Sequence, residues 1–69
     1  METEFEIEGD YIELIGLLKA IGIAETGGHA KFIVEEEIVY RNGELETRKR
    51  AKLVKGDVIE IDGNIIKLV

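Results

Sequence analysis

The chain has 69 residues, a net charge of −6 and no cysteine, which excludes disulfides and thiolate metal sites. With 45% apolar and 35% charged residues, it predicts one small globular domain over residues 1–69, and no apolar run is long enough to cross a membrane. The acidic start, Met1 to Glu4, lacks the basic and apolar character of a signal peptide, so we expect a cytoplasmic protein.

The first predicted elements are a strand and a helix. Residues 4–8 alternate charged and apolar side chains, which is typical of a half-buried strand. Asp10 followed by Glu13 fits the start of a helix. The apolar spacing of that helix continues to Ile21, and Gly22 fits a left-handed stop after it.

A second helix is predicted from a cap at Thr26 to about Glu36. Its first turn contains Gly27 and Gly28, which are poor helix formers. These glycines leave backbone amides uncovered for an anion. The alternative, which does not exclude the first, is that the two helices pack too closely there for a side chain. The predicted buried face consists of Ala30, Ile33 and Val34.

The second half of the sequence predicts strands. Asn42-Gly43 is a strong signal for a type I′ hairpin turn between residues 38–41 and 44–47. After an irregular basic segment, residues 58–61 and 65–69 form a further pair joined by a tight turn. The order predicts an α+β domain with the helices on one side of a small sheet.

Cations concentrate between residues 41 and 55. This stretch holds six cations and two glutamates, an excess of four positive charges that leaves −10 for the rest of the chain. The first thirteen residues carry six acidic side chains and no base. Such asymmetry indicates a positive face on an acidic body, as nucleic-acid binding requires. A solvated basic hairpin without a partner gives the same pattern.

Four motifs, taken in order, resemble a known family. Individually they are common, but their order and spacing resemble the RNA-binding domain of the small-subunit ribosomal protein S-four type, also called the alpha-L motif. The most similar branch is the stand-alone bacterial one labelled YaaA or YbcJ, and the core motif covers residues from about 10 to 62. The motifs are Thr26-Gly27-Gly28-His29-Ala30-Lys31, Val39-Tyr40-Arg41-Asn42-Gly43-Glu44, Arg48-Lys49-Arg50 and Lys55-Gly56-Asp57-Val58-Ile59.

The resemblance implies two antiparallel helices packed on a small, mostly antiparallel sheet. It also implies that structured RNA, plausibly ribosomal RNA, lies across the second helix and the basic loop, and that the protein associates with the ribosome. Carried over by position, the RNA-facing residues are Thr26, Gly27, Gly28, Lys31, Asn42, Arg48, Lys49, Arg50 and Lys52. The charge pattern adds Arg41 and Lys55. For Lys31, an ion pair with Glu35 on the helix surface is the alternative.

Three residues depart from the family pattern. Glu37 stands where glycine usually ends the second helix, Arg41 where a buried valine is usual, and Ile38 where a polar residue is usual. Either the inward face of this strand is shifted by one residue, or Arg41 points outward and joins the basic surface.

Catalysis is not expected. With one histidine, no cysteine and no serine, the chain lacks the usual nucleophile–base pairs, and we expect no metal and no cofactor. Phe5 and Tyr11 are expected in the core, so shape and phosphate contacts, rather than base stacking, are the predicted mode of RNA recognition. The alternative function is an acidic adaptor that docks onto ribosomal or other basic proteins.

Overall fold

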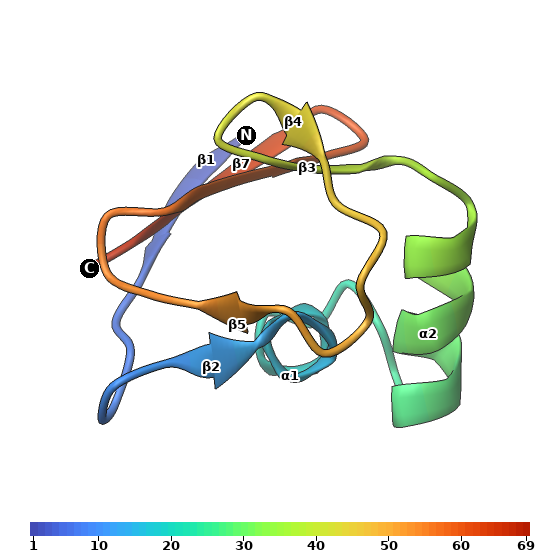
Figure 1. The fold of residues 1–69 in the computed structure, drawn as a ribbon, viewed down its shortest axis with the longest axis horizontal. Helices are drawn as coiled ribbons and strands as arrows, with labels where there is room; N and C mark the ends of the chain where they lie inside the picture. Colours follow the sequence, from blue (N-terminus) through green and yellow to red (C-terminus); the bar gives the residue numbers. More distant parts are fainter.

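The computed structural model describes residues 1–69 and contains two helices and seven strands (Figure 1). Five strands form the main sheet, in the order β1-β7-β6-β3-β4, and β2 pairs with β5 separately. The predicted α+β class, two helices on a small and mostly antiparallel sheet, is confirmed. The elements are β1 (Glu2–Phe5), β2 (Ile12–Glu13), α1 (Leu14–Ala20), α2 (Gly27–Glu35), β3 (Val39–Arg41), β4 (Glu44–Leu45), β5 (Lys52–Leu53), β6 (Val58–Ile61) and β7 (Asn64–Leu68).

The two ends of the chain lie side by side in the sheet. β1 pairs with β7 in parallel, with Glu2 opposite Ile65 and Phe5 opposite Leu68. The first strand therefore ends at Phe5, earlier than the alternation over residues 4–8 indicated, although Ile7 is buried as that alternation predicts. The Ile7 amide still donates to the carbonyl of Val69, the residue after β7, at 2.9 Å, so the pairing of the two chain ends continues beyond both strands.

The start of α1 was predicted wrongly. Ile12 and Glu13 pair with Leu53 and Lys52 as the β2–β5 ladder, so the helix begins at Leu14 without any side-chain cap. A strand pairing between distant segments has overridden the local capping signal at Asp10. The predicted end is confirmed, because Gly22 has a φ of 81°.

The predicted start of α2 is confirmed. Thr26 Oγ1 accepts a hydrogen bond from the His29 amide at 3.0 Å, as an N-cap should. The predicted inward residues Ala30, Ile33 and Val34 are all buried. Past the other end, Glu37 adopts a φ of 58°, so a non-glycine residue takes the left-handed position that the family usually gives to glycine.

The register of β3 is not shifted. Val39 is completely buried, whereas Ile38 and Tyr40 on either side of it are exposed. Arg41 follows Val39 by two residues and therefore lies on the same side of the strand. It is only half-buried, at the edge of the core, rather than on the outward face.

The core lies between the helices and one face of the main sheet. Figure 1 shows α1 and the β2–β5 pair facing the sheet across the core, with α2 at one side. The same view looks nearly along α1 but across α2, so the helices cross, where the resemblance implied an antiparallel pair. Neither helix is long and apolar enough to span a bilayer. The largest fully buried side chains are Leu14, Leu17, Leu18, Val34, Val39, Leu53, Ile59, Ile66 and Leu68.

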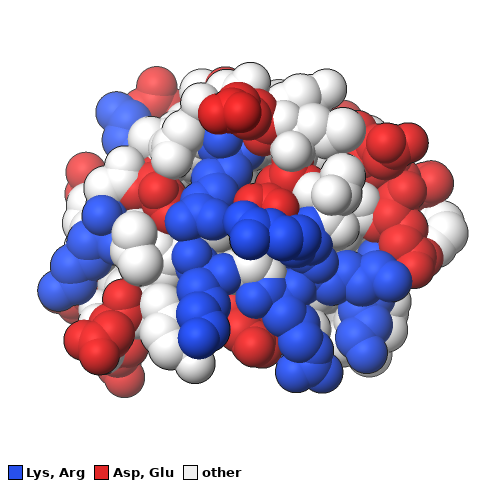
Figure 2. Space-filling model, in the orientation of Figure 1, with Lys and Arg blue, Asp and Glu red and all other residues white.

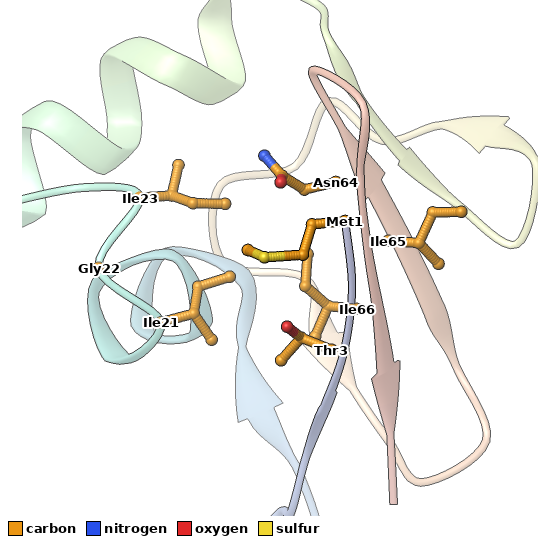
Figure 3. A pocket seen from close by; sticks show the side chains of 8 residues that line it. All are labelled: Met1, Thr3, Ile21, Gly22, Ile23, Asn64, Ile65 and Ile66. Atoms are coloured by element: carbon orange, nitrogen blue, oxygen red, sulfur yellow. The ribbon is translucent and has the colours of Figure 1, made fainter.

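An apolar pocket of about 210 Å³ lies between the end of α1 and the β1–β7 pair (Figure 3). The side chain of Met1 reaches into it beside Ile21. No lysine or arginine lines this pocket, so it is separate from the predicted RNA-binding residues. Its lining consists of Met1, Thr3, Ile21, Gly22, Ile23, Asn64, Ile65 and Ile66.

Candidate nucleic-acid interface

The basic loop, residues 48–52, is anchored on the start of α1. The Leu14 amide donates to the Ala51 carbonyl at 2.9 Å, and the Ile15 amide donates to the Lys49 carbonyl at 3.2 Å. These bonds satisfy helix-start amides that would otherwise lack partners. Because Ala51 is buried, the loop is fixed by its backbone and by one small apolar residue while its cationic side chains face outward.

The cations of the chain gather on one face of the molecule. Figure 2 shows lysine and arginine side chains across the middle and lower part of the view that contains the basic loop, with acidic side chains at the rim and a few between the cations. Arg48 and Arg50 are the most exposed arginines, with 72% and 68% of their side-chain surface open to solvent. The predicted concentration of charge is therefore also a concentration in space.

Acidic neighbours accompany three of these cations. Arg48 Nε lies 3.2 Å from Glu46 Oε2. Lys49 Nζ lies 2.7 Å from Glu35 Oε2, and Arg50 is 3.9 Å from Glu13. The Lys49–Glu35 and Arg50–Glu13 pairs are exposed on both partners, and such pairs contribute only up to about 1 kcal/mol, so a phosphate can compete for these two cations. The Arg48–Glu46 pair differs, because only 9% of the Glu46 side chain is exposed.

Arg41 is held inside the protein. Its Nε and Nη2 donate to Asp57 Oδ2 at 3.1 and 2.8 Å, and Nη2 also donates to the Lys52 carbonyl at 3.0 Å. Only 22% of its side chain is exposed. Both explanations offered for Arg41 are therefore wrong: the strand is not shifted, and the side chain does not point outward. Its guanidinium instead links β3 to the start of β5 and to the turn before β6.

Asp57 is the centre of this network. Besides Arg41, its carboxylate accepts from the Val54 amide at 2.9 Å and from Asn42 Nδ2 at 2.9 Å. Burial alone would raise the pKa of Asp57, but the hydrogen bonds from Val54, Asn42 and Arg41 outweigh burial and lower it. Asp57 therefore remains ionised at neutral pH.

Asn42 forms the hairpin turn predicted from the sequence. It has a φ of 53° and Gly43 a φ of 86°, as a type I′ turn requires. Its Oδ1 accepts from the Val58 amide at 2.8 Å while its Nδ2 donates to Asp57. The oxygen and the nitrogen of the Asn42 side chain are thus both hydrogen-bonded within the protein, so Asn42 stabilises the turn.

Glu46 plays a similar part beside the basic loop. Its carboxylate accepts from the Arg48 amide and Nε and lies 3.6 Å from Arg41 Nη1. Burial opposes ionisation, but hydrogen bonds and charge from Arg48, with the charge of Arg41, lower the pKa of Glu46. Glu46 therefore fixes the guanidinium and the backbone of Arg48 together.

The remaining predicted cations are free of acidic partners. Lys31 and Lys55 are exposed and form no ion pair, and Glu35 binds Lys49 rather than Lys31. Lys52 Nζ lies over the ring of Tyr11, 5.0 Å from its centroid, a cation–π arrangement that leaves the ammonium at the surface.

The glycines at the tip of α2 are not there for close packing. A Cβ added at Gly27 would meet nothing within 4 Å, and one at Gly28 would meet only Thr26 Oγ1, at 3.9 Å. The packing explanation is therefore wrong. Lys49 touches Glu35 in the last turn of α2, about 12 Å along the helix axis from this tip, so the tip and that part of the loop are separate points on the surface.

Three residues of this region were missed from the sequence. Glu46 and Asp57 were counted only as charges or turn residues, although both are buried beside arginines. Tyr11 was assigned to the core but is 44% exposed beside Lys52. An acidic residue inside a strongly basic segment was the available signal for Glu46, while no local pattern indicated Asp57.

The chain belongs to the S4 domain family, which it matches over residues 5–69. It is 39% identical over 59 residues to an Escherichia coli (strain K12) protein named "Putative RNA-binding protein YbcJ", covering 86% of this chain and 84% of that protein. It is 36% identical over 63 residues to a Bacillus subtilis (strain 168) protein named "Probable ribosome maturation protein RlbA", covering 91% and 89%. The recognised family is therefore confirmed, and membership supports an RNA-binding role.

Proposed function

We propose that this protein is a non-enzymatic module that binds structured RNA, with ribosomal RNA as its natural target. The S4 domain and the names of the relatives support RNA as the ligand, and the name of the Bacillus subtilis relative supports a connection with ribosome maturation. The observation that carries the proposal is the gathering of exposed cations on one face of a chain whose net charge is −6.

The chemistry of folded RNA suits this surface. A-form RNA hides its base edges in a deep, narrow major groove, so a protein meets mainly phosphates, 2′-hydroxyls and shape. Arginine forks bind phosphate oxygens in pairs, and lysines supply mobile point charges. In this proposal Arg48, Lys49, Arg50, Lys52 and Lys55 supply the main contacts, Lys31 and the α2 tip at Thr26, Gly27 and Gly28 extend them, and Arg41 and Asn42 hold the hairpin in place.

The test reverses the two most exposed arginines. The double variant Arg48→Glu/Arg50→Glu should fold, because both side chains project into solvent and Glu46 keeps Arg41 as a cationic partner at 3.6 Å. It should lose at least about a hundredfold in affinity for a structured ribosomal RNA fragment. Affinity is measured by fluorescence anisotropy at fixed salt, and folding by circular dichroism.

The matched control is Lys19→Glu/Lys67→Glu, which changes the net charge by the same −4 at two cations outside the basic segment. It should bind RNA more than tenfold better than the arginine variant. Equal losses in both variants would mean that only total charge matters, and retained affinity in the arginine variant would remove the basic loop from the interface.

A second candidate, an adaptor for basic proteins, is favoured by the net charge of −10 outside the basic segment and by exposed side chains on the outward face of the sheet. Register places Leu45, Tyr40 and Glu60 in one row across β4, β3 and β6, and Leu45 and Tyr40 are each about two-fifths exposed. The arginine variant distinguishes the two functions, because it would leave capture of a basic protein unchanged or make it stronger.

A further inference from the structure

Tyr11 presents an aromatic ring at the border of the basic surface. It precedes β2, whose Ile12 pairs with Leu53 in β5, so the strand pairing that displaced the start of α1 also brings this ring outward. Lys52, the partner of Glu13 in the same ladder, extends its ammonium over the ring at 5.0 Å. The ring therefore adjoins a cation of the proposed RNA interface.

The same tyrosine lines a groove of about 350 Å³ that Lys52 does not line. Its apolar walls come from Phe5, Tyr11 and Ile12, and its polar groups are Glu6 and Glu8. Both glutamates are exposed and form no ion pair with any cation of the protein. The groove thus combines an aromatic surface with carboxylates whose acceptor oxygens are free.

We propose that this groove binds one unpaired guanine of the RNA, stacked on Tyr11. The inference rests on the RNA-binding function proposed above and adds a base-reading element to it. Exposed aromatic side chains stack on unpaired bases of RNA. An ionised carboxylate offers only acceptors and takes two parallel donors at once.

The acceptors select the base. Guanine carries the ring N1–H and the exocyclic N2 amino group side by side on its Watson–Crick edge, which matches a carboxylate in two places. On the same edge adenine and cytosine pair an amino donor with a ring acceptor, and the single N3–H donor of uracil lies between two carbonyl acceptors. If adenine, cytosine or uracil occupied the groove, one of its acceptor atoms would face a carboxylate oxygen. Two acceptors form no hydrogen bond, so these bases should bind more weakly than guanine.

Charge also orients the nucleotide. The carboxylates of Glu6 and Glu8 repel the phosphates, whereas Lys52, which lies over the Tyr11 ring but does not line the groove, attracts them. A guanine in the groove therefore has its phosphate directed toward the basic loop and its Watson–Crick edge toward the acidic rim. Tyr11 therefore lies where the phosphate-binding surface adjoins the proposed base-binding groove.

The first test uses four RNA hairpins that differ only in one bulged nucleotide, together with a fully paired hairpin. The bulged-guanine hairpin should bind the wild-type protein roughly 5- to 100-fold more tightly than the paired one. Tyr11→Leu should abolish this gain, and Tyr11→Phe should retain most of it. Glu6→Gln/Glu8→Gln should bring the guanine and adenine bulges within about threefold of each other, since amide side chains both donate and accept.

A second measurement reads the ring directly. The chain has two tyrosines and no tryptophan, so in the Tyr40→Phe variant all tyrosine fluorescence comes from Tyr11. The bulged-guanine hairpin should quench this emission, whereas the paired hairpin should bind with little quenching. Tyr40 lies outside the groove and is exposed, so its replacement should leave RNA affinity unchanged.

The outcomes separate this inference from the function on which it rests. If the paired hairpin binds but no bulge improves affinity or quenches Tyr11, the guanine site is refuted and the RNA-binding function stands. If a different base is preferred, or Tyr11→Leu keeps the gain, the guanine site is also refuted. If no RNA binds at physiological salt, the proposed function itself fails.

Discussion

At the scale of single residues, the carboxylates of Glu46 and Asp57 hold two arginines of the basic segment in place. Glu46 binds both the side chain and the amide of Arg48, and Asp57 holds Arg41 between β3 and the turn before β6. Both pKa values are lowered by these arginines and by hydrogen bonds that outweigh burial. The acidic residues in and beside the basic segment therefore reduce the conformational freedom of its arginines, which lowers the entropy lost on binding.

Asp57→Asn should destabilise the fold by about 2–3 kcal/mol at pH 7, because the charge of half-buried Arg41 loses its nearer carboxylate and keeps only Glu46, at 3.6 Å. The ordinary pKa of this carboxyl, 3.8, is lowered by folding, so its contribution to stability is present above that pKa and is lost as the pH falls through the lowered one. The free energy of unfolding of the wild type should fall with acid below about pH 4, and less steeply in Asp57→Asn.

Urea unfolding between pH 7 and pH 2.5 measures both effects. Asp62→Asn is the matched control, since Asp62 is exposed in a turn with a φ of 48°, a conformation that asparagine tolerates well. Its stability should change by less than about 0.5 kcal/mol. An equal loss in both variants would mean that the Asp57 network contributes nothing beyond ordinary turn geometry.

At the scale of elements, predictions based on local chemistry were confirmed. The Thr26 cap, the stop at Gly22 and the Asn42-Gly43 turn each depend on one residue's own backbone or side chain. Predictions failed where a distant segment decides the structure. Residues 12–13 form a strand only because residues 52–53 reach them, and nothing near β1 reveals its parallel partner β7.

The same limit applied to the candidate site. The position of the basic loop in the sequence was evident from its composition, and its cations do gather on one face. The carboxylates that hold these cations could not be assigned, because Glu35 and Asp57 meet Lys49 and Arg41 only through the fold. The exposure of Tyr11 could not be predicted for the same reason. Its spacing from the following apolar residues fitted a helix that included it, but α1 begins only at Leu14.

Gly28→Ala tests the role of the α2 tip. Because the added methyl group meets only Thr26 Oγ1, at 3.9 Å, the variant should be more stable by about 0.5 kcal/mol. If a phosphate approaches the exposed amides there, RNA affinity should fall about three- to tenfold despite this gain.

Gly16→Ala is the control in α1, where a Cβ would meet only Ile12, at 3.6 and 4.0 Å. It should also increase stability, measured by thermal unfolding, with no change in RNA affinity. Unchanged affinity in Gly28→Ala would show that the tip makes no close phosphate contact, and the glycines would then need another explanation.

At the scale of the whole molecule, binding is a balance between a local positive surface and a negative body. The basic segment carries an excess of four positive charges within a chain of net charge −6. Beyond about 10 Å at 0.1 M salt, the acidic residues are largely screened from a bound phosphate. Close ones are not, and Glu35, at 2.7 Å from Lys49, is the closest acidic competitor among the exposed pairs.

This balance can be measured from the salt dependence of RNA affinity in the wild type and in the variant Glu35→Gln. With about four to six phosphate contacts, log K should fall with log salt at a slope of roughly −3 to −5. Glu35→Gln should raise RNA affinity several-fold at low salt by freeing Lys49, with a smaller gain at 0.5 M salt. Glu60→Gln, which makes the same charge change on the outward face of β6, should have little effect at either salt concentration.

Anisotropy titrations over a salt series give all of these values. A slope near zero would mean that phosphates contribute little, and equal gains from both variants would mean that net charge, rather than release of Lys49, governs affinity.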